Sequence, residues 1–319
     1  MPEFGEAVDP DLGVIRTSLS LGSSFKLWPV HFRKVTLVGV GLLGGSLGLA
    51  LKRRGLVDEV HGFVRRQASV AECLGLGVVD RCTRNIEEAI NGADLVVLCS
   101  PVSQMAGLFS EFKRFLTPDC LVTDVGSVKS TVVADLETLA AEAGVLFVGS
   151  HPMAGAEKNG PAFARADLFE KAVCVVTPTS STPPIALEKV TTLWESLGSR
   201  VLRMNPMLHD DLVGRSSHLP HVVAAGLANY ILSPAHPKAQ AELCAGGFRD
   251  LTRIASSSPS MWRDIALGNR RNLSRVLGVF IEDLQEFCRA LDEGDGPAVE
   301  EFFKQAQERR QSRYPEIGS

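Results

Sequence analysis

Three segments of the chain carry histidine or arginine in settings that could support chemistry. His151 follows Ser150, His218 and His221 lie three residues apart, and Arg253 lies further along the chain. Histidine titrates near neutral pH and can accept or release a proton, and arginine can hold a carboxylate through two parallel hydrogen bonds. These side chains are therefore candidates for proton transfer and for binding an anionic substrate.

Each candidate also has a structural alternative. His151 could cap a turn, His218 and His221 could be core histidines, and the stem of Arg253 could cover apolar surface. The H-x-x-H pair has neither a third ligand nor the glutamate of a zinc protease helix, so we predict no metal site. The seven cysteines are widely spaced and form no C-x-x-C pair, which indicates reduced thiols in a cytoplasmic protein.

A glycine pattern near the N-terminus predicts a dinucleotide site. The segment is Gly39-Val40-Gly41-Leu42-Leu43-Gly44, and an apolar run precedes it while a helical pattern follows. That context is the one the G-x-G-x-x-G fingerprint requires. Gly39 permits the tight turn, Gly41 lets the backbone approach a pyrophosphate, and Gly44 lets helix and strand pack closely. A glycine-rich turn without a ligand is the alternative.

The end of the second predicted strand indicates which cofactor binds. NAD-binding folds usually carry a carboxylate there for the ribose 2′-hydroxyl, but here Val64 is followed by Arg65 and Arg66. Guanidinium groups pair well with a 2′-phosphate, so we predict NADP, unless both arginines are solvated surface residues. We expect the loop after the fourth strand to lie beside the nicotinamide or its ribose; its residues are Ser100, Pro101, Val102 and Gln104.

The elements that position these residues follow an alternating pattern. Apolar runs predict strands at 34–40, 60–64, 95–100, 121–125, 146–149, 172–177 and 200–204. Helical patterns separate several of them, which is typical of a parallel sheet. After Pro206 only helical patterns follow, at 206–232, 238–243, 248–255, 259–290 and 298–311.

We therefore predict an α/β fold, in which a Rossmann-type, mostly parallel sheet domain precedes an all-α domain. The predicted parts are a flexible N-terminal extension (1–30), a dinucleotide-binding domain (31–204) and a helical domain (205–319). The formal net charge of −4 argues against a nucleic-acid partner. No apolar stretch is long enough to span a membrane, and the first thirty residues, with four carboxylates, do not resemble a signal peptide.

Several motifs occur together in one order: GSVKS at 126–130, SHPMAG-x-E at 150–157, SHLPH at 217–221, GGFRDLTRIA at 246–255 and MWRDI at 261–265. With the glycine fingerprint, they resemble the prephenate/arogenate dehydrogenase family over about residues 33 to 290. The resemblance implies a homodimer, a helical dimerisation domain and an active site in the cleft between domains. The implied reaction transfers a hydride from the ring of arogenate or prephenate to NADP and releases carbon dioxide.

The resemblance also implies roles for individual residues. His151 becomes the catalytic histidine, and Ser127 hydrogen-bonds to it or to the substrate hydroxyl, unless Ser127 only caps a helix. Arg253 would hold a substrate carboxylate. The remaining substrate-binding residues would surround the ring and its hydroxyl; they are His218, His221, Gly247 and Trp262.

Glu157 bears on substrate choice. An acidic residue shortly after the HPxxG motif goes with arogenate use in this family, because arogenate carries an ammonium group where prephenate carries a keto group. Alternatively, Glu157 pairs with a lysine or caps a helix, and prephenate stays open as the substrate. Another Rossmann-plus-helical hydroxyacid dehydrogenase, or a non-catalytic NADP-sensing protein, would share the glycines without needing His151 or Arg253. The chain ends at Ser319, and we expect no appended mutase or regulatory domain.

Overall fold

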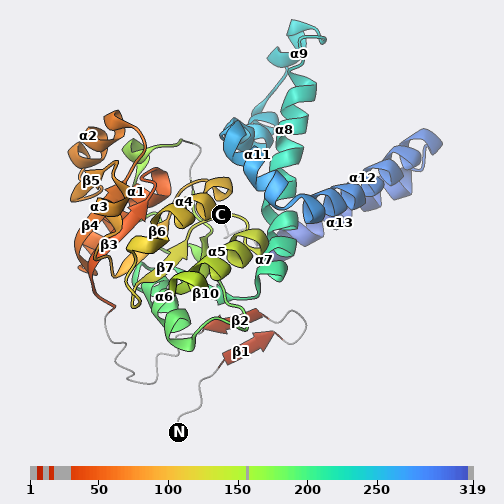
Figure 1. The fold of residues 1–319 in the computed structure, drawn as a ribbon. Helices are drawn as coiled ribbons and strands as arrows, with labels where there is room; N and C mark the ends of the chain where they lie inside the picture. Colours follow the sequence, from red (N-terminus) through yellow and green to blue (C-terminus); the bar gives the residue numbers. More distant parts are fainter. Residues whose placement is uncertain (1–5, 10–13, 18–29, 156–157, 315–319) are drawn as a thin grey trace. The chain divides into compact units, whose positions relative to one another are not determined.

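The computed structural model describes residues 6–9, 14–17, 30–155 and 158–314. The chain divides into two compact units, residues 1–269 and 270–319. The first unit holds the sheet and the helices up to residue 268, and the second holds the two C-terminal helices (Figure 1).

Six parallel strands form the main part of the sheet, in the order β5-β4-β3-β6-β7-β8. They are β3 (Phe32–Val38), β4 (Val57–Phe63), β5 (Arg81–Thr83), β6 (Leu95–Leu98), β7 (Leu121–Asp124) and β8 (Leu146–Pro152). This is the strand order of a Rossmann fold, with the direction of progress reversing between β3 and β6. The predicted fold class, with its mostly parallel sheet, is confirmed.

The sheet continues past β8 with strands of mixed direction. β9 (Val173–Thr177) is antiparallel to β8, and β10 (Arg200–Arg203) is parallel to β9. Two strands that were not predicted, β2 (Val14–Thr17) and β1 (Glu6–Asp9), add to the edge beside β10. They lie in the stretch predicted as a flexible extension, and the rest of that stretch before residue 30 lies outside the described residues.

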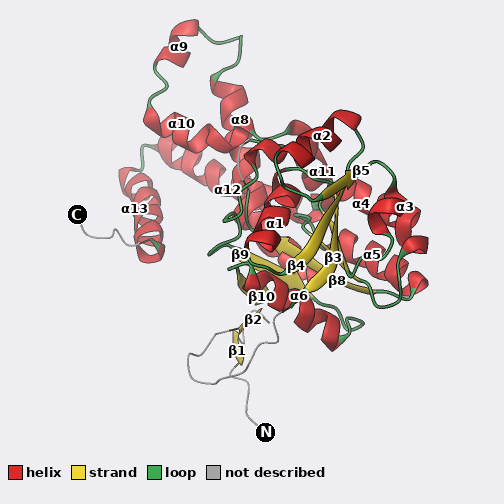
Figure 2. Ribbon diagram, turned by 90° about the vertical axis from the view of Figure 1, so that its left-hand side faces the viewer, coloured by secondary structure: helices red, strands yellow, loops and turns green. Residues whose placement is uncertain are grey.

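Helices cover both faces of the sheet (Figure 2). On β6, Leu95 and Val97 belong to one core cluster, and Val96 and Leu98 belong to the other. The first cluster includes residues of α1 (Leu42–Arg53), α2 (Gln67–Gly75) and α6 (Pro184–Ser196); the second includes residues of α3 (Ile86–Ile90), α4 (Val102–Phe112) and α5 (Ser130–Ala143). A strand buried on both faces explains the continuous apolar run in its sequence.

The chain is helical after β10. The first unit ends with α7 (Pro206–Val213), a π-helical turn (Gly214–His218), α8 (Leu219–Ile231), α9 (Lys238–Glu242), α10 (Gly246–Thr252), a 3-10 turn (Arg253–Ser256) and α11 (Pro259–Gly268). The π-helical turn interrupts what the sequence predicted as one helix over 206–232, and such turns are frequent at functional sites. No strand occurs among the described residues after β10.

The second unit is a pair of helices, α12 (Arg270–Glu293) and α13 (Gly296–Arg313). Aromatic side chains join them: the ring of Phe287 lies 4.6 Å from that of Phe302 and 5.7 Å from that of Phe303, between centroids. Within the described part of the chain, no helix is long and apolar enough to cross a membrane.

Candidate functional site

A crevice of about 540 Å³ lies at the carboxyl ends of β3, β4 and β6, where the strand order reverses. Open α/β sheets bind their ligands at this point. Most of the predicted cofactor-binding residues line it: Gly39, Gly41, Val64, Arg65, Arg66, Ser100, Pro101 and Gln104. Leu42, Leu43 and Gly44 lie on α1, and Val102 begins α4 and lines a different cavity.

The glycines of the fingerprint have distinct surroundings. Gly39 has a φ of +100°, which favours glycine. A Cβ on Gly44 would lie 2.3 Å from the Gly39 carbonyl oxygen, so helix and strand pack too closely for a side chain. A Cβ on Gly41 would meet no described atom within 4 Å. Open space beside the Gly41 backbone at the start of α1 suits a phosphate group.

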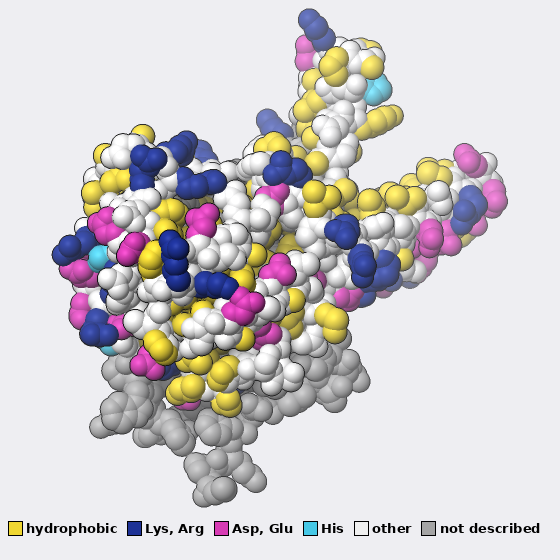
Figure 3. Space-filling view, in the orientation of Figure 1, with side chains coloured by type: hydrophobic (Ala, Val, Ile, Leu, Met, Phe, Trp, Pro, Cys, Tyr) yellow, Lys and Arg dark blue, Asp and Glu magenta, His cyan; other side chains and the backbone are white. Residues whose placement is uncertain are grey.

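Polar groups of the crevice also suit a nucleotide. Arg65 and Arg66 are exposed at the end of β4, and the backbone oxygen of Arg65 accepts a 3.0 Å hydrogen bond from Arg84 Nε. Sequence reasoning missed this third arginine. Ser100 Oγ is buried and has no hydrogen-bond partner among the described residues. Lys and Arg side chains gather over the end of this unit that carries α1 and α2 (Figure 3).

His151 lies within β8. The sequence predicted that the strand ends at Gly149 and that His151 follows it, but β8 continues to Pro152 and pairs His151 with Val175 of β9. That part of the prediction is wrong, because antiparallel pairing with β9 keeps the chain extended for three more residues. His151 still lies near the carboxyl end of its strand, the edge at which the nucleotide crevice opens.

A chain of hydrogen bonds runs from His151 into the helical part of the unit. His151 Nδ1 lies 2.8 Å from His209 Nε2, and His209 Nδ1 lies 2.8 Å from Asp210 Oδ1. All three side chains are buried. His209 and Asp210 lie on α7 and were not among the predicted site residues. A histidine next to an aspartate just after the last strand was the available signal.

The GSVKS motif supplies a buried ion pair behind His151. Lys129 Nζ contacts the carboxylate of Asp124 at the end of β7 and donates a 2.9 Å hydrogen bond to the carbonyl oxygen of Ser150. Asp124 Oδ1 in turn accepts a 3.1 Å hydrogen bond from the Ser150 backbone. The motif thus fixes the residue that precedes His151, a role that sequence reasoning did not assign to it.

The electrostatic surroundings keep these histidines neutral. Burial lowers the pKa of His151 well below its usual value, and the nearby His209, Lys129 and His218 lower it further. Burial also lowers the pKa of His209, although Asp210 opposes that shift. For Asp210, burial alone would raise the pKa, but hydrogen bonds from His209 and from the start of α5 lower it. At neutral pH the site therefore holds a neutral His151, which is linked through His209 to an ionised Asp210.

His218 joins the same cluster. Its Nδ1 lies 3.1 Å from Asn269 Nδ2, which also donates a 2.7 Å hydrogen bond to the carbonyl oxygen of Asp210. Burial lowers the pKa of His218 to about 4, while Asp210 and a hydrogen bond to the backbone of Ser127 act in the opposite direction. The predicted residues Ser127, His151 and His218 are therefore brought together.

Trp262 on α11 lies against both histidines of the SHLPH motif. Its ring stacks on His221, with centroids 3.8 Å apart, and meets the His218 ring edge-on at 5.9 Å. Trp262 Nε1 is buried and has no hydrogen-bond partner among the residues that the structure describes. Gly247 and Arg253 are exposed, on α10 and the turn after it. Glu157 lies outside the described residues.

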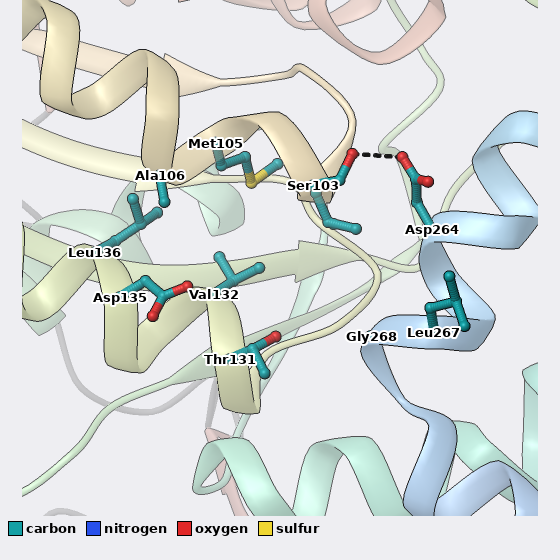
Figure 4. Close-up of a pocket in the computed structure, with 11 residues that line it drawn as sticks. Ser103, Met105, Ala106, Thr131, Val132, Asp135, Leu136, Asp264, Leu267 and Gly268 are labelled. Carbon is teal, nitrogen blue, oxygen red and sulfur yellow. Dashed lines mark hydrogen bonds between the residues drawn. The ribbon is translucent and has the colours of Figure 1, made fainter.

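A smaller cavity, of about 310 Å³, lies between α4, α5 and α11 (Figure 4). At its edge Ser103 Oγ donates a 2.5 Å hydrogen bond to Asp264 Oδ2. Val102, predicted to contact the cofactor, lines this cavity. The bond ties the first turn of α4, which follows the loop that borders the nucleotide crevice, to the helix that carries Trp262.

Comparison with known proteins assigns both parts of the chain to one family. Residues 47–203 match the description "Prephenate dehydrogenase, nucleotide-binding domain", and residues 205–305 match "Prephenate dehydrogenase, dimerization domain". The chain belongs to the prephenate dehydrogenase family. The predicted family is thus confirmed, and the chain is a dehydrogenase of tyrosine biosynthesis.

Individual relatives of the family cover most of the chain. A cyclohexadienyl dehydrogenase of Zymomonas mobilis is 36% identical over 288 residues, which are 88% of this chain and 95% of that protein. A crystal structure of prephenate dehydrogenase from Aquifex aeolicus, in complex with hydroxyphenyl propionate and NAD⁺, has 34% identity and a TM-score of 0.82, covering 88% of this chain and 98% of that one. Synechocystis arogenate dehydrogenase has 28% identity and a TM-score of 0.74, covering 88% and 99%.

Proposed function

We propose that this chain oxidatively decarboxylates arogenate, or prephenate, with NADP as the hydride acceptor and His151 as the group that acts on the ring hydroxyl. The observation that carries the proposal is a buried, neutral His151 near the carboxyl end of β8, at the sheet edge where the nucleotide crevice opens. A neutral imidazole can accept a proton, and burial excludes the water that would compete for it.

The proposed reaction neither consumes nor releases a net proton. His151 accepts a hydrogen bond from the ring hydroxyl, so electron density on that oxygen supports the oxidation of the ring carbon. The bond from the ring to its carboxylate breaks, carbon dioxide leaves, and the electron pair completes the aromatic ring. A proton taken up by His151 returns to the phenolic oxygen. The nicotinamide ring supplies the hydride acceptor in this scheme.

NADP is favoured over NAD by the end of β4. Arg65 and Arg66 line the nucleotide crevice, and no carboxylate does so among the described residues. A 2′-phosphate would pair with either guanidinium. The Aquifex relative was crystallised with NAD⁺, so the arginines are the feature on which this choice depends.

The substrate ring would lie against Trp262, His218 and His221. Trp262 and His221 stack, and the buried indole N–H of Trp262 can donate to a polar group of the substrate. Arg253 would hold a carboxylate, and Glu157 would favour the ammonium group of arogenate. The match of residues 205–305 to a dimerization domain supports a homodimer.

The experiment is a steady-state assay of the purified chain with four combinations: arogenate or prephenate, each with NADP or NAD. We expect turnover chiefly with arogenate and NADP. Turnover with prephenate alone would remove the proposed role of Glu157, and a preference for NAD would remove that of Arg65 and Arg66. Absence of turnover in all four combinations would contradict the proposed substrates.

A further inference from the structure

We infer that His209 and Asp210 are positioning residues, which hold His151 in the tautomer that carries its lone pair on Nε2. The inference rests on the proposed function, in which His151 acts on the ring hydroxyl. It concerns the hydrogen-bonded chain His151–His209–Asp210, which reaches from β8 to α7.

Backbone hydrogen bonds hold Asp210 in place at one end of the His151–His209–Asp210 series. Its Oδ1 accepts a 2.7 Å hydrogen bond from the Lys129 backbone, and its Oδ2 accepts a 2.8 Å bond from the Ser130 backbone. These amides stand at the start of α5, where the helix dipole also favours a negative charge. An ionised carboxylate can only accept hydrogen bonds. Asp210 therefore requires a donor from every neighbour, His209 included.

Because Asp210 can only accept, it determines which ring nitrogen carries the proton in His209 and, through His209, in His151. His209 Nδ1 must carry the proton that it donates to Asp210, so the Nε2 of a neutral His209 has only a lone pair. His151 Nδ1 must then carry the proton that it donates to His209 Nε2. A neutral His151 with its proton on Nδ1 has its lone pair on Nε2, the nitrogen left for the substrate hydroxyl.

This hydrogen-bonded arrangement holds the His151 tautomer only while both His151 and His209 stay neutral. A protonated His209 would donate from Nε2, and His151 Nδ1 would have to accept, which moves the proton of His151 to Nε2. The groups that face the pair from the surrounding elements are Lys129 and Asp124, His218 on the π-helical turn, and Asp210. Lys129 and His218 disfavour a second positive charge on His151, and burial acts in the same direction.

Water cannot replace these partners. The side chains of His209 and Asp210 are 0% and 1% exposed. The carbonyl oxygen of Asp210 is also held by Asn269 Nδ2 at 2.7 Å. The orientation of His151 therefore depends on α7, although α7 belongs to the part of the chain that follows the sheet.

Asp210→Asn tests the inference most sharply. The Asn side-chain N–H₂ can donate to His209 Nδ1, which would reverse both tautomers and place a proton on His151 Nε2. We measure kcat with the substrate and cofactor that the wild type prefers, and we expect it to fall by roughly 10²–10⁴-fold. The NADP dissociation constant should change less than about twofold. The matched control is Asp211→Asn, because Asp211 is the next carboxylate on α7 and pairs with Arg215 instead; it should keep wild-type kcat.

His209 offers a second pair of variants. His209→Gln presents an amide oxygen that can accept from His151 Nδ1, whereas His209→Leu removes any acceptor at similar size. We expect His209→Gln to keep at least tenfold more kcat than His209→Leu, with similar melting temperatures. Equal kcat in both variants, or losses that follow the melting temperature alone, would mean that α7 acts only as scaffold and would overturn the inference. If Asp210→Asn does not fold, this pair decides.

A substrate-free measurement separates this inference from the proposed function. Nitrogen-15 NMR of the imidazole side chains should find the Nδ1–H tautomer at His151 in the wild type and the Nε2–H tautomer in Asp210→Asn. If the wild type turns over neither arogenate nor prephenate but the tautomers follow this pattern, the proposed function fails and the positioning role stands. An Nε2–H tautomer at His151 in the wild type overturns the inference.

Discussion

Gly41 and Gly44 stand three residues apart in the fingerprint, yet a methyl group added at each should have different effects. A Cβ on Gly41 meets nothing within 4 Å, whereas a Cβ on Gly44 lies 2.3 Å from the carbonyl oxygen of Gly39. Gly41→Ala therefore leaves the folded protein undisturbed and fills space that the cofactor would use. Gly44→Ala forces the start of α1 away from β3.

The magnitudes follow from these contacts. In Gly41→Ala, loss of one hydrogen bond from backbone to phosphate costs about 1.5–3 kcal/mol of binding, or roughly ten- to a hundred-fold in the cofactor dissociation constant. In Gly44→Ala, the Cβ and the carbonyl oxygen must separate by about 1 Å, and such overpacking costs about 1–3 kcal/mol of stability or more. That corresponds to a melting temperature lower by roughly 3–10 °C.

The assay pairs a thermal melt with a fluorescence titration of NADPH for each variant. Gly107→Ala is the matched control, because Gly107 lies inside α4 with nothing within 4 Å of an added Cβ; alanine there should raise the melting temperature slightly. The reasoning is refuted if Gly41→Ala binds NADPH as the wild type does, or if Gly44→Ala melts at the wild-type temperature.

Three further predictions follow from the charges of the site. Replacing Arg65 and Arg66 together with alanine should raise the KM for NADP about tenfold or more and leave the KM for NAD nearly unchanged; equal effects on both cofactors would contradict a 2′-phosphate contact. The pKa values of His151 and His218 are lowered in the folded protein, so below pH 6.5 the unfolded chain binds more protons than the folded one. The free energy of unfolding should therefore be highest above pH 6.5 and fall between pH 6.5 and 4, by ~3 kcal/mol from His218 alone. Urea unfolding across that range checks this, and a free energy of unfolding that does not change with pH contradicts it. Lys129→Met should leave its carboxylate partner buried without a cation and destabilise the chain by about 3–5 kcal/mol; a denaturation midpoint like that of the wild type would show that the pair does not stabilise the fold.

The sheet and the nucleotide crevice could be predicted because local patterns determine them. The run from Leu95 to Leu98 is apolar at every position, as a strand buried on both faces requires. Gly39 is needed where φ is positive and the chain turns towards α1. Each signal lies within a few residues of the element it specifies, so the sequence alone is sufficient.

The polar network behind His151 could not be predicted in the same way. Lys129 and Asp210 meet across 81 positions of sequence, and His151 and His209 across 58. No periodicity links such pairs. The last three residues of β8 depend on pairing with β9, which is also a long-range contact. Likewise β1 and β2 are only four residues long each; β2 joins the sheet by pairing with the distant β10, and β1 joins it by pairing with β2.

The central claim is that His151 acts on the substrate, and His151→Asn tests it most directly. We expect kcat to fall by about 10²–10⁴-fold, while the NADPH dissociation constant measured by fluorescence stays within twofold of the wild type. The exposed His31, which faces Asp58 at 3.3 Å, gives the matched control His31→Asn, with wild-type turnover. Turnover that survives in His151→Asn, with cofactor binding intact, would contradict the assignment of the catalytic histidine.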